Sequence, residues 1–67
     1  MITIHVISKT SSESFSRSID PKSDDEFQYE ICELVTKGRE LFGKYYLDFD
    51  SMDGTEEQKE WVDAEMS

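Results

Sequence analysis

The sequence is poor in the residues that cross-link small folds. Among its 67 residues it has one cysteine, Cys32, and one histidine, His5. An internal disulfide needs two cysteines, and a structural zinc site takes about four Cys or His ligands. Packing alone must therefore hold the fold, and a reducing, cytoplasmic setting fits this composition. A chain this short buries only about 60% of its unfolded surface, so we expect a small core and low stability. Binding to a partner or self-association would add to that stability.

Long apolar segments and positive charge are scarce as well. The first apolar segment, MITIHVI, is short and has no basic residues before it, so we do not expect a signal peptide. Nothing approaches the ~18 consecutive apolar residues of a membrane span. Seven Lys and Arg residues against sixteen Asp and Glu residues give a formal net charge of −9. That charge argues against direct binding to nucleic acid or to an anionic membrane, because both would repel the chain.

The first third of the chain has the period-2 pattern of half-buried strands. In ITIHV, Ile or Val at every second position alternates with Thr or His. In FSRSI, Phe15, Arg17 and Ile19 share one side and serines the other. The polar segment KTSSES connects the two, and Pro21 ends the second because proline lacks the N–H that a ladder needs. We predict a β-hairpin over about residues 2–19, with its second strand at a sheet edge.

The middle of the chain has the period of a helix. The segment SDDE at residues 23–26 is a capping box, and Gly43 is placed to end the helix. One stripe carries the apolar positions, with Gly38 offering a close approach: Phe27, Ile31, Leu34, Val35, Gly38, Leu41 and Phe42. We predict a helix over about residues 24–42. Cys32 lies one position off this stripe and is predicted to be a small core or boundary residue.

The C-terminal third predicts a strand and a short helix. KYYLDFD alternates again and indicates a third strand over about residues 44–49. SMDG supplies a turn, and TEEQ is a second capping box that opens a helix over about residues 55–65. Trp61 and Val62, with Gln58 or Met66, would form its inner side. The order ββαβα predicts one α+β domain over residues 1–67, with a three-stranded antiparallel sheet packed by one long helix plus a short acidic C-terminal helix.

The negative charge is concentrated in that last third. Residues 1–45 hold eight acids and six bases, a net charge of −2, whereas residues 46–67 hold eight acids and one base, a net charge of −7. We call the following carboxylates the acidic pole: Asp48, Asp50, Asp53, Glu56, Glu57, Glu60 and Asp63. Carboxylates three or four residues apart on a helix stand about 5–6 Å from one another, and duplex DNA carries a comparably dense charge.

Metal binding and catalysis have weak support in the sequence. DFDSMDG resembles the start of an EF-hand loop, but Asp53 occupies the sixth position, where glycine belongs, and Lys59 the twelfth, where the bidentate glutamate belongs. His5 has no second His or Cys nearby, and the carboxylates around Cys32 would disfavour its thiolate. General acid–base chemistry needs two partly buried carboxylates, for which so short a chain has little room. We expect no catalysis, no metal and no cofactor.

The acidic pole leads to the functional hypothesis. A rigid body with this charge can bind the basic groove of a nucleic-acid-processing enzyme as a nucleic-acid mimic, with Tyr46 and Trp61 as apolar anchors beside the carboxylates. In size and composition the chain resembles compact acidic proteins of phages and mobile elements that block restriction, CRISPR or repair enzymes. The resemblance implies an inhibitor or regulator. The alternative is an adaptor or subunit that binds through apolar surface or the FSRSI edge, with the acids serving solubility only.

Overall fold

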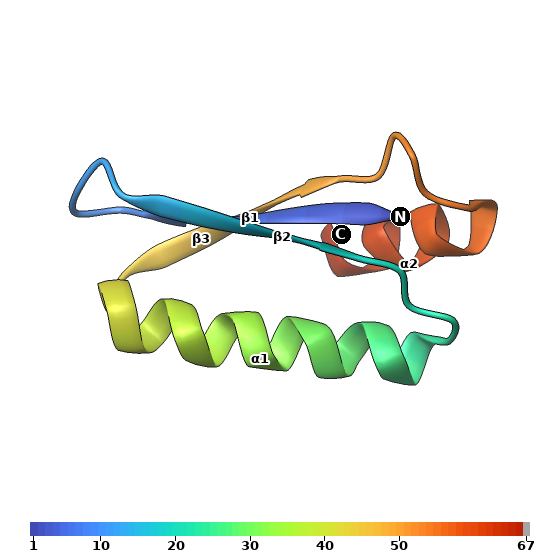
Figure 1. The fold of residues 1–67 in the computed structure, drawn as a ribbon, viewed down its shortest axis with the longest axis horizontal. Coiled ribbons are helices and arrows are strands. Elements are labelled where there is room, and N and C mark those ends of the chain that lie inside the picture. Colours follow the sequence, from blue (N-terminus) through green and yellow to red (C-terminus); the bar gives the residue numbers. More distant parts are fainter. Residues whose placement is uncertain (67) are drawn as a thin grey trace.

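The computed structural model of the protein describes residues 1–66 and contains three strands and two helices (Figure 1). The predicted α+β class and the order ββαβα are confirmed, and each predicted boundary lies within one residue of the observed one. Neither helix in this part of the chain has the length and apolar character needed to cross a membrane. In chain order the elements are β1 (Ile2–Ser8), β2 (Ser14–Ile19), α1 (Asp24–Phe42), β3 (Tyr45–Asp50) and α2 (Glu56–Met66).

Strand β1 is the centre of an antiparallel sheet with the order β2-β1-β3. One side of β1 pairs Ile2 with Ile19 of β2, and the other side pairs Thr3 with Asp50 of β3. β1 is rich in β-branched residues, which fit a strand with neighbours on both sides. β2 and β3 are therefore the two edges of the sheet, and the edge position predicted for FSRSI is confirmed.

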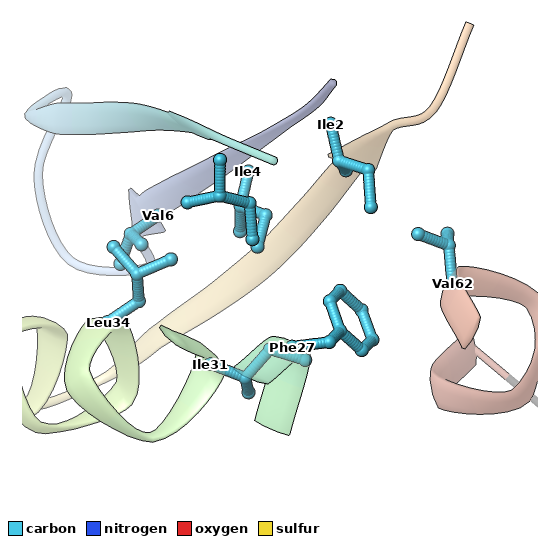
Figure 2. Packing of buried hydrophobic residues seen from close by; sticks show 8 residues of the cluster. Ile2, Ile4, Val6, Phe27, Ile31, Leu34 and Val62 are labelled. Atoms are coloured by element: carbon cyan, nitrogen blue, oxygen red, sulfur yellow. The ribbon is translucent and has the colours of Figure 1, made fainter. Parts of the chain in front are cut away.

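The sheet has one covered face and one open face. On β1, Ile2, Ile4 and Val6 are fully buried, whereas the side chains between them are only half-buried. Helix α1 runs along the covered face, and α2 lies at the end of the sheet where the N-terminus is found (Figure 1). Figure 2 shows Phe27 of α1 and Val62 of α2 directed toward the β1 side chains in one shared core. The open face carries the serines of β2 and the carboxylates of β3.

Helix α1 begins and ends at the predicted signals, with one difference in its cap. The Glu26 N–H donates to Ser23 Oγ at 3.3 Å, as a capping box requires. The Glu26 carboxylate, however, accepts from the Lys22 N–H at 2.8 Å rather than from the Ser23 N–H. The chain bends at these two residues, which brings the earlier N–H over the helix end. At the other end Gly43 donates its N–H to the Arg39 carbonyl, and its φ of 74° is one that a residue with a side chain adopts only with strain.

At Gly38 helix α1 lies close to the sheet. A Cβ placed on it would lie 2.8 Å from Cγ1 of Val6 and 3.3 Å from the Tyr45 ring. The predicted close approach is confirmed, because any larger residue would force the helix away from β1.

Leu41 is a predicted stripe residue that the structure leaves exposed, with 58% of its surface accessible. Phe42 instead packs against Phe15 of β2, with ring centroids 5.9 Å apart. Neighbouring helix residues point about 100° apart, and in this last turn Phe42 takes the position that faces β2, which leaves Leu41 on the solvent side. The prediction that Leu41 belongs to the buried stripe was wrong, and the last turn contributes a single aromatic side chain.

Candidate acidic interface

Strand β3 places Asp48 and Asp50 on the open face of the sheet. Tyr45, Leu47 and Phe49 turn inward and are half-buried, so the residues between them point outward. Asp48 lies opposite His5 of β1 in the strand register. Two carboxylates of the acidic pole therefore stand on a rigid strand whose other face is held by the core.

The connection after β3 is a short turn built on a carboxylate. Asp50 Oδ1 accepts from the Met52 N–H at 3.1 Å, and the Gly54 N–H donates to the Ser51 carbonyl at 2.9 Å. Asp53 is exposed in this turn, and Met52 at its tip is 84% accessible. The turn thus carries one carboxylate and one apolar side chain out into solvent. Among residues 1–66, His, Cys, Asp and Glu side chains form no group of three or more that could hold a metal ion.

Helix α2 is held in place by Gln58. The Gln58 N–H donates to Thr55 Oγ1 at 3.1 Å, and the Thr55 N–H donates to Gln58 Oε1 at 3.0 Å, which confirms the second capping box. Gln58 Nε2 also donates to Asp20 Oδ1 at 2.8 Å and to the Pro21 carbonyl at 3.1 Å. The side chain is only 2% exposed, and it ties the start of α2 to the segment that joins β2 to α1. Met66, the other predicted inner residue, is exposed.

The outer side of α2 carries the remaining carboxylates of the pole. Gln58 and Val62 point inward, so Glu56, Glu60 and Asp63, spaced by four and three residues, line up on the opposite side. All seven residues of the acidic pole are exposed. The C-terminal end of α2 reaches β3, because Leu47, Asp48, Phe49, Glu65 and Met66 together line one depression of about 380 Å³.

Two cations lie at the acidic pole, but within residues 1–66 neither forms an ion pair with its carboxylates. They are Lys59 of α2 and the N-terminal ammonium of Met1, which donates to the Asp53 carbonyl at 2.9 Å. Four ion pairs connect residues within the described range 1–66, and none of them includes a carboxylate of the pole. Glu65, beside the pole, accepts a hydrogen bond from Gln28 Nε2 at 3.2 Å, which is a neutral donor. The charge of this surface is therefore left to solvent or to a partner.

The two predicted anchors differ in how available they are. Tyr46 projects from β3 on the open face and is 47% exposed. Trp61 is half-buried, and its ring stacks on Phe27 with centroids 6.1 Å apart. Trp61 is therefore part of the packing that attaches α2 to α1, whereas Tyr46 is free to contact a partner.

Cys32 and His5 lie away from this surface. Cys32 is exposed on α1, so its prediction as a core or boundary residue was wrong. It follows the buried Ile31 directly, and the helical turn of about 100° per residue carries it out to solvent. His5 is half-buried on the open sheet face between Ser16 of β2 and Asp48 of β3.

Sequence reasoning missed a second acidic region, between β2 and α1. Arg17 Nη1 lies 3.5 Å from Glu30 and 3.3 Å from Glu33, and Lys22 Nζ lies 2.7 Å from Asp20. The bond from Lys22, supported by Gln58, lowers the pKa of Asp20 to about 2. The sequence does contain a signal for this region: Arg17 lies on the inward side of its strand, where its charge needs a partner from the helix.

Comparison with protein-family models, with curated proteins and with solved structures finds no match to this chain.

Proposed function

We propose that the protein is a non-enzymatic inhibitor or regulator that binds the basic surface of a nucleic-acid-binding protein in the place of nucleic acid. The observation that carries this proposal is the lack of ion pairs at the acidic pole: seven exposed carboxylates lie on β3, the following turn and α2, and none of them is in an ion pair among residues 1–66. Like charges held this close destabilise a compact state, so a surface of this kind is costly unless a cation from outside meets it.

The supports of the pole favour recognition over simple solvation. β3 and α2 are both attached to the core, through half-buried Phe49 and buried Val62, so the backbone positions that carry their carboxylates are fixed relative to one another. Lys and Arg side chains arranged for phosphates can pair with carboxylates in the same way, and Arg does so with two parallel hydrogen bonds. Carboxylates on an ordered backbone also lose less backbone entropy on binding than carboxylates on a flexible tail do.

Apolar contact is available beside the charges. Tyr46 on β3 and Met52 at the tip of the turn are both exposed next to carboxylates of the pole. Tyrosine and methionine are enriched in the cores of protein interfaces, where acidic residues alone give little affinity. The carboxylates of the acidic pole would then steer association, and Tyr46 and Met52 would supply the apolar contacts.

The test uses proteins that are known to bind DNA. A cell-lysate fraction retained on a DNA column is passed over the immobilised protein at low salt, and the retained proteins are released by high salt or by duplex DNA. We expect both to release them, because ion pairs at an exposed surface are screened by salt and compete with phosphates. Retention that survives both treatments would overturn the proposal.

Charge reversal locates the surface. Glu60→Lys with Asp63→Lys reverses two carboxylates of the pole, and Glu13→Lys with Glu40→Lys reverses two exposed carboxylates outside it, so both variants have the same net charge. We expect the first variant to lose at least about tenfold in affinity, from two lost pairs of up to ~1 kcal/mol each and added repulsion. The second should bind nearly as the parent does. Equal losses in the two variants would mean that only total charge matters.

A further inference from the structure

The outer edge of β2 offers unpaired backbone groups. The Ser8 N–H donates to the Glu13 carbonyl at 3.1 Å on the β2 side, and the Lys9 N–H donates to the Lys44 carbonyl at 3.0 Å on the β3 side. Backbone groups alternate between the two sides of an antiparallel strand, so every second residue of β2 bonds to β1. The residues that bond inward are Phe15, Arg17 and Ile19, and those whose N–H and C=O groups point outward are Ser14, Ser16 and Ser18.

The two edges of the sheet are not equally open. On β3 the exposed side chains include Asp48 and Asp50, and the end of α2 lies beside the strand. On β2 the exposed side chains are serines, and the register from Ile2–Ile19 to Ile7–Ser14 runs without a bulge. Charges, bulges and covering elements are the usual means of blocking an edge. The one charge on β2, Arg17, is held under the sheet by Glu30 and Glu33, so the β2 edge remains accessible.

A groove runs beside this edge. The backbone of α1 packs against β1 and β3 more than against β2, so β2 overhangs the helix. Beneath it lies a groove with a volume of about 650 Å³. Its walls are the last residues of β2 with the following segment, and the first turns of α1: Arg17, Ser18, Ile19, Asp20, Pro21, Asp25, Glu26, Tyr29 and Glu30.

The chemistry of the groove selects a basic occupant. Four carboxylates and one guanidinium line it. Asp20 and Glu30 are already paired with Lys22 and Arg17, whereas Asp25 and Glu26 are in no ion pair among residues 1–66 and leave the groove negatively charged. Tyr29 is 63% exposed at the groove and presents an aromatic ring to whatever enters. Long Lys or Arg side chains can lay their aliphatic stems on such a ring and place their charged ends among carboxylates. An acidic or purely apolar segment would lose these contacts.

We propose that the β2 edge and its groove bind an extended, basic segment of a partner protein, which joins the sheet as a fourth strand. Backbone hydrogen bonds to the three outward serines hold the segment, and every second side chain points down into the groove. A second copy of this chain is a poorer occupant, since each copy carries a net charge of −9 and would bring one acidic groove against another. This surface is separate from the acidic pole, and the proposal does not rest on the proposed function.

The decisive variant is Ser16→Pro. Proline there removes an outward N–H and leaves the bonds between β1 and β2 in place, which is the situation in which edge strands tolerate proline. Ser16→Ala is the matched control, because it removes the hydroxyl and keeps the N–H. The probe is the peptide acetyl-Thr-Arg-Thr-Arg-Thr-Arg-Thr-amide with a fluorescent label, and binding is measured by anisotropy at physiological salt. Circular dichroism of each variant verifies that the fold is kept.

We expect the peptide to bind the parent and Ser16→Ala alike, and Ser16→Pro at least tenfold more weakly. The same peptide with Glu in place of Arg should not bind. Attraction to net charge alone would leave peptide binding by Ser16→Pro unaffected, because this variant keeps every charge, and that outcome would overturn the proposal.

Sedimentation of the protein without peptide tests whether a second copy of the chain is the occupant. A dimer that Ser16→Pro dissociates would assign the edge to a second copy and overturn the assignment to a basic segment. Binding that persists in Glu60→Lys with Asp63→Lys would separate this surface from the acidic pole.

Discussion

The β2 side and the β3 side of the molecule both carry many carboxylates, but they use them differently. On the β2 side Arg17 bridges Glu30 and Glu33 and so fastens β2 to α1, and Lys22 pairs with Asp20 within the segment that joins the two elements. On the β3 side the acidic pole has no such pair among residues 1–66. Net charge alone therefore does not identify a binding surface, because paired acids contribute to the fold whereas unpaired acids are available to a partner.

The two sides depend on one core, and Phe27 is where they meet. Its fully buried ring lies 6.4 Å from the Phe49 ring of β3 and 6.1 Å from the Trp61 ring of α2. We expect Phe27→Ala to lower the free energy of unfolding by about 3–5 kcal/mol, which is most of the stability of so small a chain. Urea unfolding followed by circular dichroism measures it. The control is Leu41→Ala, which should change the same quantity by less than about 1 kcal/mol. Similar losses in both would contradict the core described above.

Gln58 is the polar link between the two sides. Its amide reaches Thr55, Asp20 and Pro21. Gln58→Ala removes these bonds and leaves the Pro21 carbonyl and the Thr55 N–H to find other partners. We expect a loss of about 1–3 kcal/mol in the free energy of unfolding. Lys59→Ala, one residue further and without a role in this network, serves as control in the same urea titration. A loss no larger than that of the control would show that Gln58 is replaceable.

Neutralising acids on the two sides should change stability in opposite directions. Glu60→Gln with Asp63→Asn removes self-repulsion, and it removes negative charge from the later part of a helix whose last turn has no basic residue. We expect the free energy of unfolding to rise by about 0.3–1 kcal/mol. Glu33→Gln removes a partner of Arg17 and should lower it by about 0.3–1 kcal/mol, as is typical of exposed pairs. Thermal unfolding at low salt compares the two, and changes of the same sign would remove the distinction between the sides.

The smallest expected effect is on the pH dependence of stability, because acid protonates Asp20, a paired carboxylate of the β2 side. The hydrogen bond from Lys22, then that from Gln58, lowers the pKa of Asp20 from 3.8 to about 2. A carboxyl whose pKa is lower in the folded state contributes stability above its unfolded pKa and loses it as the pH falls toward the folded value. We therefore expect the melting temperature of the parent to fall more steeply between pH 4 and pH 2 than that of Asp20→Asn. Parallel curves would mean that the Lys22 pair contributes nothing in solution.

Most of the fold could be predicted because its signals are local. Period-2 alternation placed the strands, and two capping boxes with Gly43 placed the helix ends to within one residue. The misses are side chains whose surroundings come from elsewhere in the chain. Leu41 and Cys32 have the right composition for burial, but α1 can turn only one side toward the sheet. Glu26 has the right spacing for the cap, but the bend before the helix offers the Lys22 N–H instead.

The alternation of the strands, the caps of the helices and the division of charge between a balanced body and an acidic C-terminal third all follow from the sequence. They depend on residues near one another in the chain or on composition alone. Three features emerge only when the chain is folded: β1 is central, the end of α2 lies beside β3, and the β2 edge stands open above a groove. The central place of β1 and the position of α2 come from contacts between distant segments, such as Thr3 with Asp50, Gln28 with Glu65 and Gln58 with Asp20. No local pattern encodes such contacts, because their free energy exists only once the core has brought the segments together.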